Sequence, residues 1–168
     1  MSTQTTINIY GNQALDRFAE SLLAHLGLNN ETAVDITYMA KKLGLNVYSA
    51  SFEDDAISGY IKIEDGKQNI YVNNTHSIQR QRFTVAHEIA HFILHRHLLE
   101  QNRGTPMFRG GDSSIAEQEA NRLAAAILMP QTKVREMYQN QKKTIQEMAE
   151  LFWVSYGAMA NRISSLGL

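Results

Sequence analysis

The chain contains no cysteine and only two prolines among its 168 residues. The absence of cysteine excludes disulfides and every zinc site that uses thiolate ligands. The N-terminus lacks the basic stretch followed by an apolar core that marks a secretion signal. No stretch approaches the roughly 20 apolar residues that a membrane-spanning helix needs. Together these absences predict a soluble, cytoplasmic protein that does not enter a membrane.

An excess of either charge is also missing, because 16 Lys and Arg residues face 17 Asp and Glu residues, for a net charge of −1. This balance gives no general reason to expect binding to nucleic acid or to an anionic membrane. Hydrophobic residues make up 43% of the chain, enough for one core of useful size. The length predicts about one structural domain. Within it we expect a catalytic core over residues 1–130 and a C-terminal helical subdomain over residues 131–168.

The most specific pattern is His87-Glu88-Ile89-Ala90-His91, which reads H-E-x-x-H. On a helix, His87 and His91 lie on one face, about 6 Å apart along the axis, so both imidazoles can reach one tetrahedral ion. Glu88 is near enough to take a proton from a water bound to that ion. No glycine or proline occurs from residue 77 to residue 96, which supports the helix. The pattern predicts a catalytic Zn²⁺ site.

The spacing of apolar residues predicts an α+β fold in which a small antiparallel sheet packs on a zincin-like pair of helices. One helix of the pair carries H-E-x-x-H and the other carries Glu117. The Asp65-Gly66 pair predicts a hairpin, with a loop longer than the two-residue form, and Thr75 or Ser77 is the expected N-cap of the motif helix. The last two helices resemble a helix-turn-helix. The motif helix is expected to begin after Thr75 or Ser77 and to include residues 82–94. The other expected helices cover residues 12–27, 35–43, 114–129, 132–138, 144–151 and 155–166. The expected strands cover residues 45–51, 56–63 and 69–72, with a short strand at 107–109 in an irregular, glycine-rich stretch.

A catalytic zinc usually takes three protein ligands, so a third must be found. His95 lies about 12 Å from His87 along the helix axis, too far for one ion. His97 would need glycine at position 94 for the chain to turn back, and that position is Leu94. We therefore expect both histidines to be exposed near the end of the helix.

Glu117 and Asn121 are four residues apart and share a face of the helix predicted over residues 114–129. We expect Glu117 to be the third ligand and Asn121 to hold a ligand histidine by a hydrogen bond. Alanines at 120, 124, 125 and 126 would let this helix pack closely on the motif helix. The alternative for Glu117 is a capping box with Ser114. Glu119 lies about 200° round the helix and is expected to face away.

In these stretches the chain resembles the ImmA/IrrE family of bacterial and phage metallopeptidases. The matching residues are 80–95, which surround H-E-x-x-H, then 117–130 with Glu-x-x-Ala-Asn and Leu-Met-Pro, and the C-terminal residues 151–167. The resemblance covers roughly residues 31–168 and is weakest before them.

This resemblance implies that His87, His91 and Glu117 bind zinc and that Glu88 is the general base. It also implies a partner, because many members are encoded beside a helix-turn-helix repressor that they cleave or inactivate. Small members encoded by phages and other mobile elements use this anti-repressor activity to induce excision or lytic growth. The substrate identity rests on the resemblance alone.

Two other functions remain open. The chain could bind and antagonise a repressor without cleaving it, or it could bind DNA through its last helix. Direct DNA binding is not expected, because that helix offers only Tyr156, Asn161 and Arg162 for readout. For the peptidase, the group that stabilises the carbonyl oxygen is not identified by the pattern, and a bound peptide would extend the sheet at residues 56–63 or 107–109. By residue type, the candidates for this group are Tyr60, His76, Arg109 and Tyr138.

Overall fold

The computed structural model describes residues 11–101 and 115–168, and these ranges contain both helices and a small sheet. The predicted α+β class is confirmed. The strand expected at 107–109 lies outside the described residues. The elements in chain order are α1 (Asn12–His25), α2 (Ile36–Lys42), β1 (Leu45–Ala50), β2 (Gly59–Glu64), β3 (Lys67–Asn73), α3 (Ile78–Leu94), α4 (Arg96–Gln101), α5 (Ile115–Leu128), α6 (Gln131–Arg135), the π-helical η1 (Glu136–Asn140), α7 (Ile145–Phe152) and α8 (Tyr156–Ser165).

The sheet has the strand order β1-β3-β2, so β3 is the central strand. β2 pairs with β3 in antiparallel orientation, whereas β1 pairs with β3 in parallel orientation. The sheet is therefore mixed, and the prediction of a purely antiparallel sheet was wrong for β1. The reason is the connection over residues 51–58, which carries the chain past the central position to the far edge before β2 begins.

The turn between β2 and β3 contains only Asp65 and Gly66, because Glu64 already pairs with Lys67. Asp65 has a φ of 49° and Gly66 a φ of 75°. Two central residues with positive φ form the hairpin turn whose twist matches that of the flanking strands. The expectation of a longer loop was wrong.

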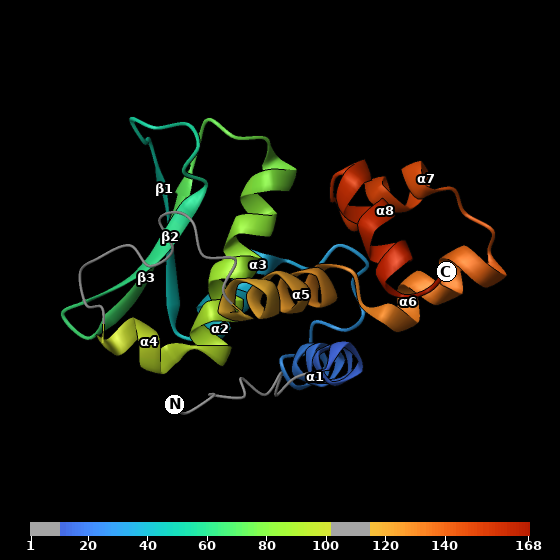
Figure 1. The fold of residues 1–168 in the computed structure, drawn as a ribbon, viewed down its shortest axis with the longest axis horizontal. Coiled ribbons are helices and arrows are strands. Elements are labelled where there is room, and N and C mark those ends of the chain that lie inside the picture. The colour runs from blue at the N-terminus through green and yellow to red at the C-terminus, as the bar shows by residue number, and fades with distance from the viewer. Residues whose placement is uncertain (1–10, 102–114) are drawn as a thin grey trace, which may run out of the picture.

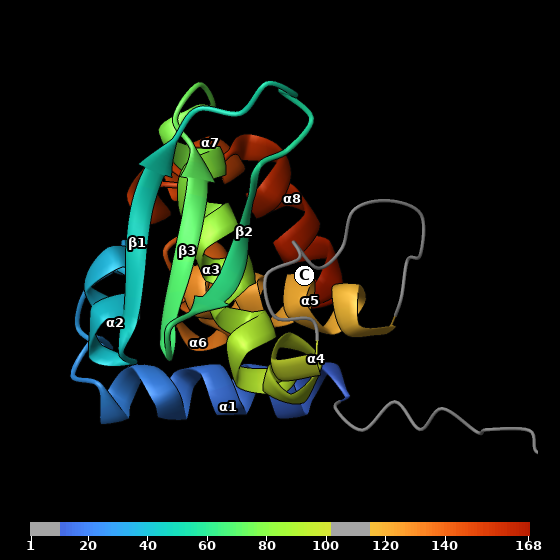
Figure 2. The ribbon, with the colours of Figure 1, turned by 90° about the vertical axis from the view of Figure 1, so that its left-hand side faces the viewer.

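In Figure 1 the motif helix α3 lies between the sheet and the C-terminal helices α7 and α8. Figure 2 looks onto the sheet, with α3 behind it and α1 running along one end. Ile61 and Ile70 on the inner face of the sheet are buried, and α3 packs against both β2 and β3. On its other side α3 packs against α5, which in turn contacts α1. The predicted pairing of the two site-bearing helices is thus observed.

The ends of α3 and the C-terminal helices follow local capping signals. Ser77 is the N-cap of α3, because its side chain accepts a hydrogen bond from the Arg80 backbone N–H at 3.3 Å. Thr144 and Glu147 form a capping box that begins α7, and Ser155 begins α8. Trp153, in the left-handed region with a φ of 57°, makes the turn between α7 and α8.

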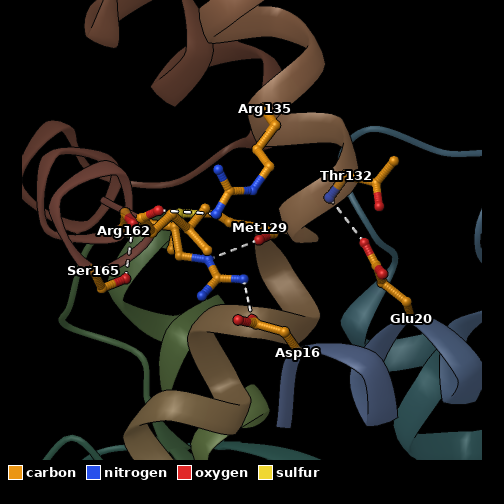
Figure 3. Close-up of polar contacts among 8 residues, drawn as sticks. Asp16, Glu20, Met129, Thr132, Arg135, Arg162 and Ser165 are labelled. Carbon is orange, nitrogen blue, oxygen red and sulfur yellow. Dashed lines mark hydrogen bonds and ion pairs between the residues drawn. The ribbon is translucent and has the colours of Figure 1, made fainter. Parts of the chain in front are cut away.

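Two buried arginines attach the C-terminal helices to the rest of the protein. Arg82 in α3 donates hydrogen bonds to the carbonyl oxygens of Trp153 and Val34. Arg162 in α8 donates to the Met129 carbonyl and pairs with Asp16 of α1, as Figure 3 shows. The division of the chain at residue 130 stays a prediction. Among the described helices, none combines the length and the apolar character that crossing a bilayer requires.

Candidate metal centre

The side chains of His87, His91 and Glu117 meet where α3 crosses α5. The Nε2 atoms of the two histidines are 2.9 Å apart. One Glu117 carboxylate oxygen lies 3.3 Å from His87 Nε2 and the other lies 3.0 Å from His91 Nε2. The three potential ligand atoms all lie within 4.8 Å of one another, and this is a group able to hold a metal ion. The structure thus brings together the three residues expected to be ligands.

The donor set fits a zinc ion. Bonds of about 2.0–2.1 Å in a tetrahedron place neighbouring ligand atoms about 3.3 Å apart, close to the observed separations. His91 is fully buried, whereas the side chains of His87 and Glu117 are 16% and 23% exposed. A site of three protein ligands that is open on one side leaves a coordination position for water or substrate.

The protonation states of His91 and Glu117 suit a cation. Burial lowers the pKa of His91, which favours the neutral imidazole that a metal needs. For His87, burial is the largest effect and lowers the pKa, but hydrogen bonding to Glu117 and the nearby carboxylates raise it overall. Burial likewise raises the pKa of Glu117, yet hydrogen bonds from the two histidines bring it down to about 2. Glu117, the expected third ligand, is therefore an ionised carboxylate.

Glu88 lines the same cavity as His87 and Glu117 and is 7% exposed. Its burial raises the pKa of the carboxyl group to about 7, with the charge on His87 and a hydrogen bond from the Ile61 backbone acting in the opposite direction. A carboxyl group with a pKa near neutrality can both accept and return a proton. Glu88 has the position and the chemistry of a general base.

Asn121 lies one helical turn after Glu117 on α5 and also lines the cavity. Its side chain helps to raise the pKa of His87, but His87 Nδ1 has no hydrogen-bond partner among the described residues. The expected hydrogen bond from Asn121 to a ligand histidine therefore stays a prediction.

The histidines beyond the motif differ from expectation. His95 was expected to be exposed, but it is 7% exposed and lies 3.5 Å from a carboxylate oxygen of Glu119. Glu119 does face away from the metal group, as expected, but it faces this buried histidine and is itself 5% exposed. The spacing of residues along the helix did not predict this pair, because the burial of His95 comes from α4 and α5, which enclose the end of α3. His97 is exposed, as expected.

The cavity at the metal group has a volume of about 250 Å³. Tyr60, His76 and Tyr138, the described candidates for stabilising a carbonyl oxygen, do not line it, and Arg109 lies outside the described residues. Arg80 does line it, and its guanidinium donates two hydrogen bonds to the Ser58 hydroxyl at 3.0 and 3.2 Å. The sequence signal for Arg80 was its position seven residues, or two helical turns, before His87.

The comparisons with known proteins place this site in a family. The sequence profile of the peptidase M78 family, described as the IrrE N-terminal-like domain, matches residues 40–164. No curated protein matches the chain significantly. Among solved structures, a transcriptional regulator of Mycobacterium tuberculosis is similar, with a TM-score of 0.67 and 16% sequence identity. The likeness covers 94% of this chain and 48% of the regulator, so the chain spans about half the length of that protein and shares its fold.

The family profile covers most of the chain, and the matched residues include α3, α5 and the C-terminal helices. On this evidence the chain belongs to the peptidase M78 family with its IrrE N-terminal-like domain, which is the ImmA/IrrE family that the sequence resembles.

Proposed function

We propose that this protein is a zinc-dependent endopeptidase that cleaves and thereby inactivates a helix-turn-helix transcriptional repressor. The observation that carries the proposal is the convergence of His87, His91 and Glu117 at a cavity that is lined by His87, Glu117 and Glu88. A metallohydrolase needs metal ligands and a general base, and here two imidazoles and a carboxylate can serve as ligands while a neighbouring carboxyl group can serve as the base.

The two histidines and Glu117 would hold the ion, and Asn121, which lines the same cavity, would support this ligand set from one helical turn further along α5. Bound Zn²⁺ supplies Lewis acidity, which polarises a carbonyl and lowers the pKa of a water molecule towards about 7. Glu88 accepts the proton from the attacking water and returns it to the leaving amine. Its buried position keeps bulk water from competing for this proton.

The substrate backbone lies along β2 in this proposal. Among the described strands, β2 pairs only with β3, so its other edge has free backbone groups that can bind an extended peptide. Gly59 at the start of β2 lines the metal cavity. Proline substitution at each position of a bound peptide tests whether the peptide pairs with β2, and unchanged binding throughout would refute that pairing.

Arg80, which also lines the metal cavity, is suited to stabilising the charge that develops on the carbonyl oxygen.

A repressor is proposed as the substrate because many members of the family are encoded beside a repressor gene. The structural neighbour is a transcriptional regulator, which is compatible with a role in the control of transcription. On α8, Arg162 is 6% exposed and is occupied by Asp16 and Met129, so it is withdrawn from any DNA-reading surface. This burial favours a protein substrate over direct DNA recognition.

The test is to incubate the zinc-loaded protein with the repressor encoded next to it, with and without a chelator, beside Glu88→Gln. Cleavage that requires metal and is abolished in Glu88→Gln supports the peptidase. Repressor inactivation that survives in Glu88→Gln without cleavage would instead establish a stoichiometric antagonist. A sequence-specific shift of DNA by the protein alone would establish a DNA-binding module.

A further inference from the structure

A second cavity of about 610 Å³ adjoins the metal centre. It lies between α5 on one side and α8 on the other, with the first half of α3 and the start of α1 contributing to its walls. Arg80, Phe83 and Asn121 line both this groove and the metal cavity. The groove is thus continuous with the proposed site of hydrolysis.

Phe83 marks the passage from one cavity to the other. Its ring lies 6.4 Å from the ring of His87, between centroids, with the planes inclined by 30°. Beyond Phe83, Leu15, Ala125, Met129, Val154 and Ala158 supply apolar surface to the groove. A chain that leaves the metal cavity over Phe83 therefore enters an apolar channel.

The far part of the groove is built by a buried ion pair. Arg162 Nη2 and Asp16 Oδ1 are 2.5 Å apart, and the two side chains are each 6% exposed. Arg162 also donates from Nε to the Met129 carbonyl at 3.0 Å (Figure 3). Because these contacts join α1, α5 and α8, the groove has a fixed wall.

Positively charged side chains outnumber negatively charged ones along the groove. Asp16 is the only carboxylate among its described lining residues, and Arg162 neutralises it. Arg80 and Arg122 also line the groove, and neither forms an ion pair with a described residue. A ligand that carries negative charge beside an apolar group is complementary to these walls.

The dimensions suit an extended polypeptide. Along α5 and the residue that follows it, the groove runs from residue 121 to residue 129, about 12 Å at 1.5 Å per residue. An extended chain advances about 3.3 Å per residue, so this length accommodates three to four substrate residues. Asn12, Gln79, Asn121 and Asn161 supply side-chain amides, each able to donate to and accept from peptide groups.

From this geometry we infer that the groove between α5 and α8 binds the substrate polypeptide on one side of the scissile bond, and that it selects a segment with a large apolar residue next to an acidic one. The apolar side chain lies against Phe83, Ala125 and Ala158, and the acidic side chain pairs with Arg122. This inference rests on the proposed peptidase function and adds the class of sequence that is recognised.

The experiment measures binding separately from hydrolysis. Zinc-loaded Glu88→Gln is screened against a library of synthetic decapeptides, and the Kd of the selected peptides is measured by fluorescence anisotropy. Ala158→Leu is then added to fill the groove, with Ala160→Leu as the matched control. Ala160 is in the same helix and is similarly half-buried, but it does not line the groove. Arg122→Gln is compared in the same way with Arg17→Gln, an exposed arginine outside the groove.

We expect the selected peptides to combine a large apolar residue with an adjacent Asp or Glu. Ala158→Leu should weaken their binding at least tenfold, Arg122→Gln should weaken only the acidic peptides, and the two controls should bind within twofold of the parent. Thermal denaturation of each variant establishes that it is folded.

If the selected peptides bind Ala158→Leu and Arg122→Gln as tightly as they bind the parent, the inference is overturned, even if the repressor is cleaved. Absence of any peptide binding by folded, zinc-loaded protein would also overturn it. A small molecule that copurifies with the protein, is seen by native mass spectrometry and is lost in Ala158→Leu while peptide binding is unchanged would show that the groove has a different occupant. Conversely, selection as expected, together with no hydrolysis of the selected peptides or of the repressor by the zinc-loaded parent protein, would refute the peptidase function and leave the groove as a peptide-binding site.

Discussion

Arg162 and Asp16 form a buried ion pair across 146 positions of sequence, with Nη2 and Oδ1 2.5 Å apart. The pair joins the last helix to the first described helix and forms part of the wall of the groove between α5 and α8. Each side chain depends on the other, because a buried charge without its partner is costly.

Replacing Asp16 by asparagine leaves the Arg162 charge buried without a counter-ion. We expect the free energy of unfolding to fall by about 3 kcal/mol, measured by urea denaturation. The double variant Asp16→Leu with Arg162→Met removes both charges and should recover most of this loss. A single variant as stable as the parent protein would contradict the assignment of the pair as a structural connection.

Glu117 and Glu119 are two residues apart on α5 but face different histidines. Glu117→Gln replaces an anionic ligand by a weaker neutral one, so zinc affinity should fall by more than the roughly 10- to 100-fold that loss of a supporting residue costs. Glu119→Gln should retain one zinc per chain, because that side chain faces His95. Competition titration with a chromophoric chelator measures both affinities, and equal losses in the two variants would argue against Glu117 as a ligand.

Gly59 has no room for a side chain, since a Cβ atom would lie 2.4 Å from the Tyr71 carbonyl oxygen and 2.7 Å from Thr84 Cγ2. Gly59→Ala should lower the free energy of unfolding by about 1–3 kcal/mol, because backbone and α3 must both shift. In the matched variant Gly157→Ala, the added methyl group meets nothing within 4 Å, and α8 should gain about 0.5–1 kcal/mol from the better helix former. Urea denaturation of the two variants should therefore give changes of opposite sign.

Glu64 links stability to pH on the exposed side of the hairpin. Hydrogen bonds from Lys62, Tyr71 and Asn69 lower the pKa of this carboxyl from its ordinary 4.5 to about 2. A lowered pKa means that the folded state holds the proton less tightly than the unfolded state. The stabilisation is therefore complete above pH 4.5 and is lost as the pH falls towards about 2.

Glu64→Gln removes this titration. We expect its thermal midpoint to fall less than that of the parent protein between pH 5 and pH 2, and NMR titration of the parent should place the Glu64 carboxyl well below the other glutamates. Parallel curves for the two proteins would show that Glu64 does not titrate as described.

Much of the helical structure was predictable because its signals are local. Ser77, Thr144 and Ser155 each accept a backbone N–H of the first turn that follows, and such caps are visible in sequence. The exclusion of His95 and His97 as ligands followed from helix rise and from Leu94. The parallel pairing of β1 was not predictable in this way, because no local pattern shows which edge of a hairpin a third strand will join.

The placing of the two candidate histidine ligands is mainly a property of the sequence, since H-E-x-x-H places two imidazoles on one face of any helix that contains it. The crossing of α3 and α5 decided the rest: it brought Glu117 to both histidines, enclosed His95 against Glu119, and placed Arg80 in the cavity. The groove beyond Phe83 exists only in the tertiary structure, because its walls come from α1, α3, α5 and α8. Contacts between such distant segments depend on packing and on buried pairs such as Arg162 with Asp16, which periodicity along the chain does not encode.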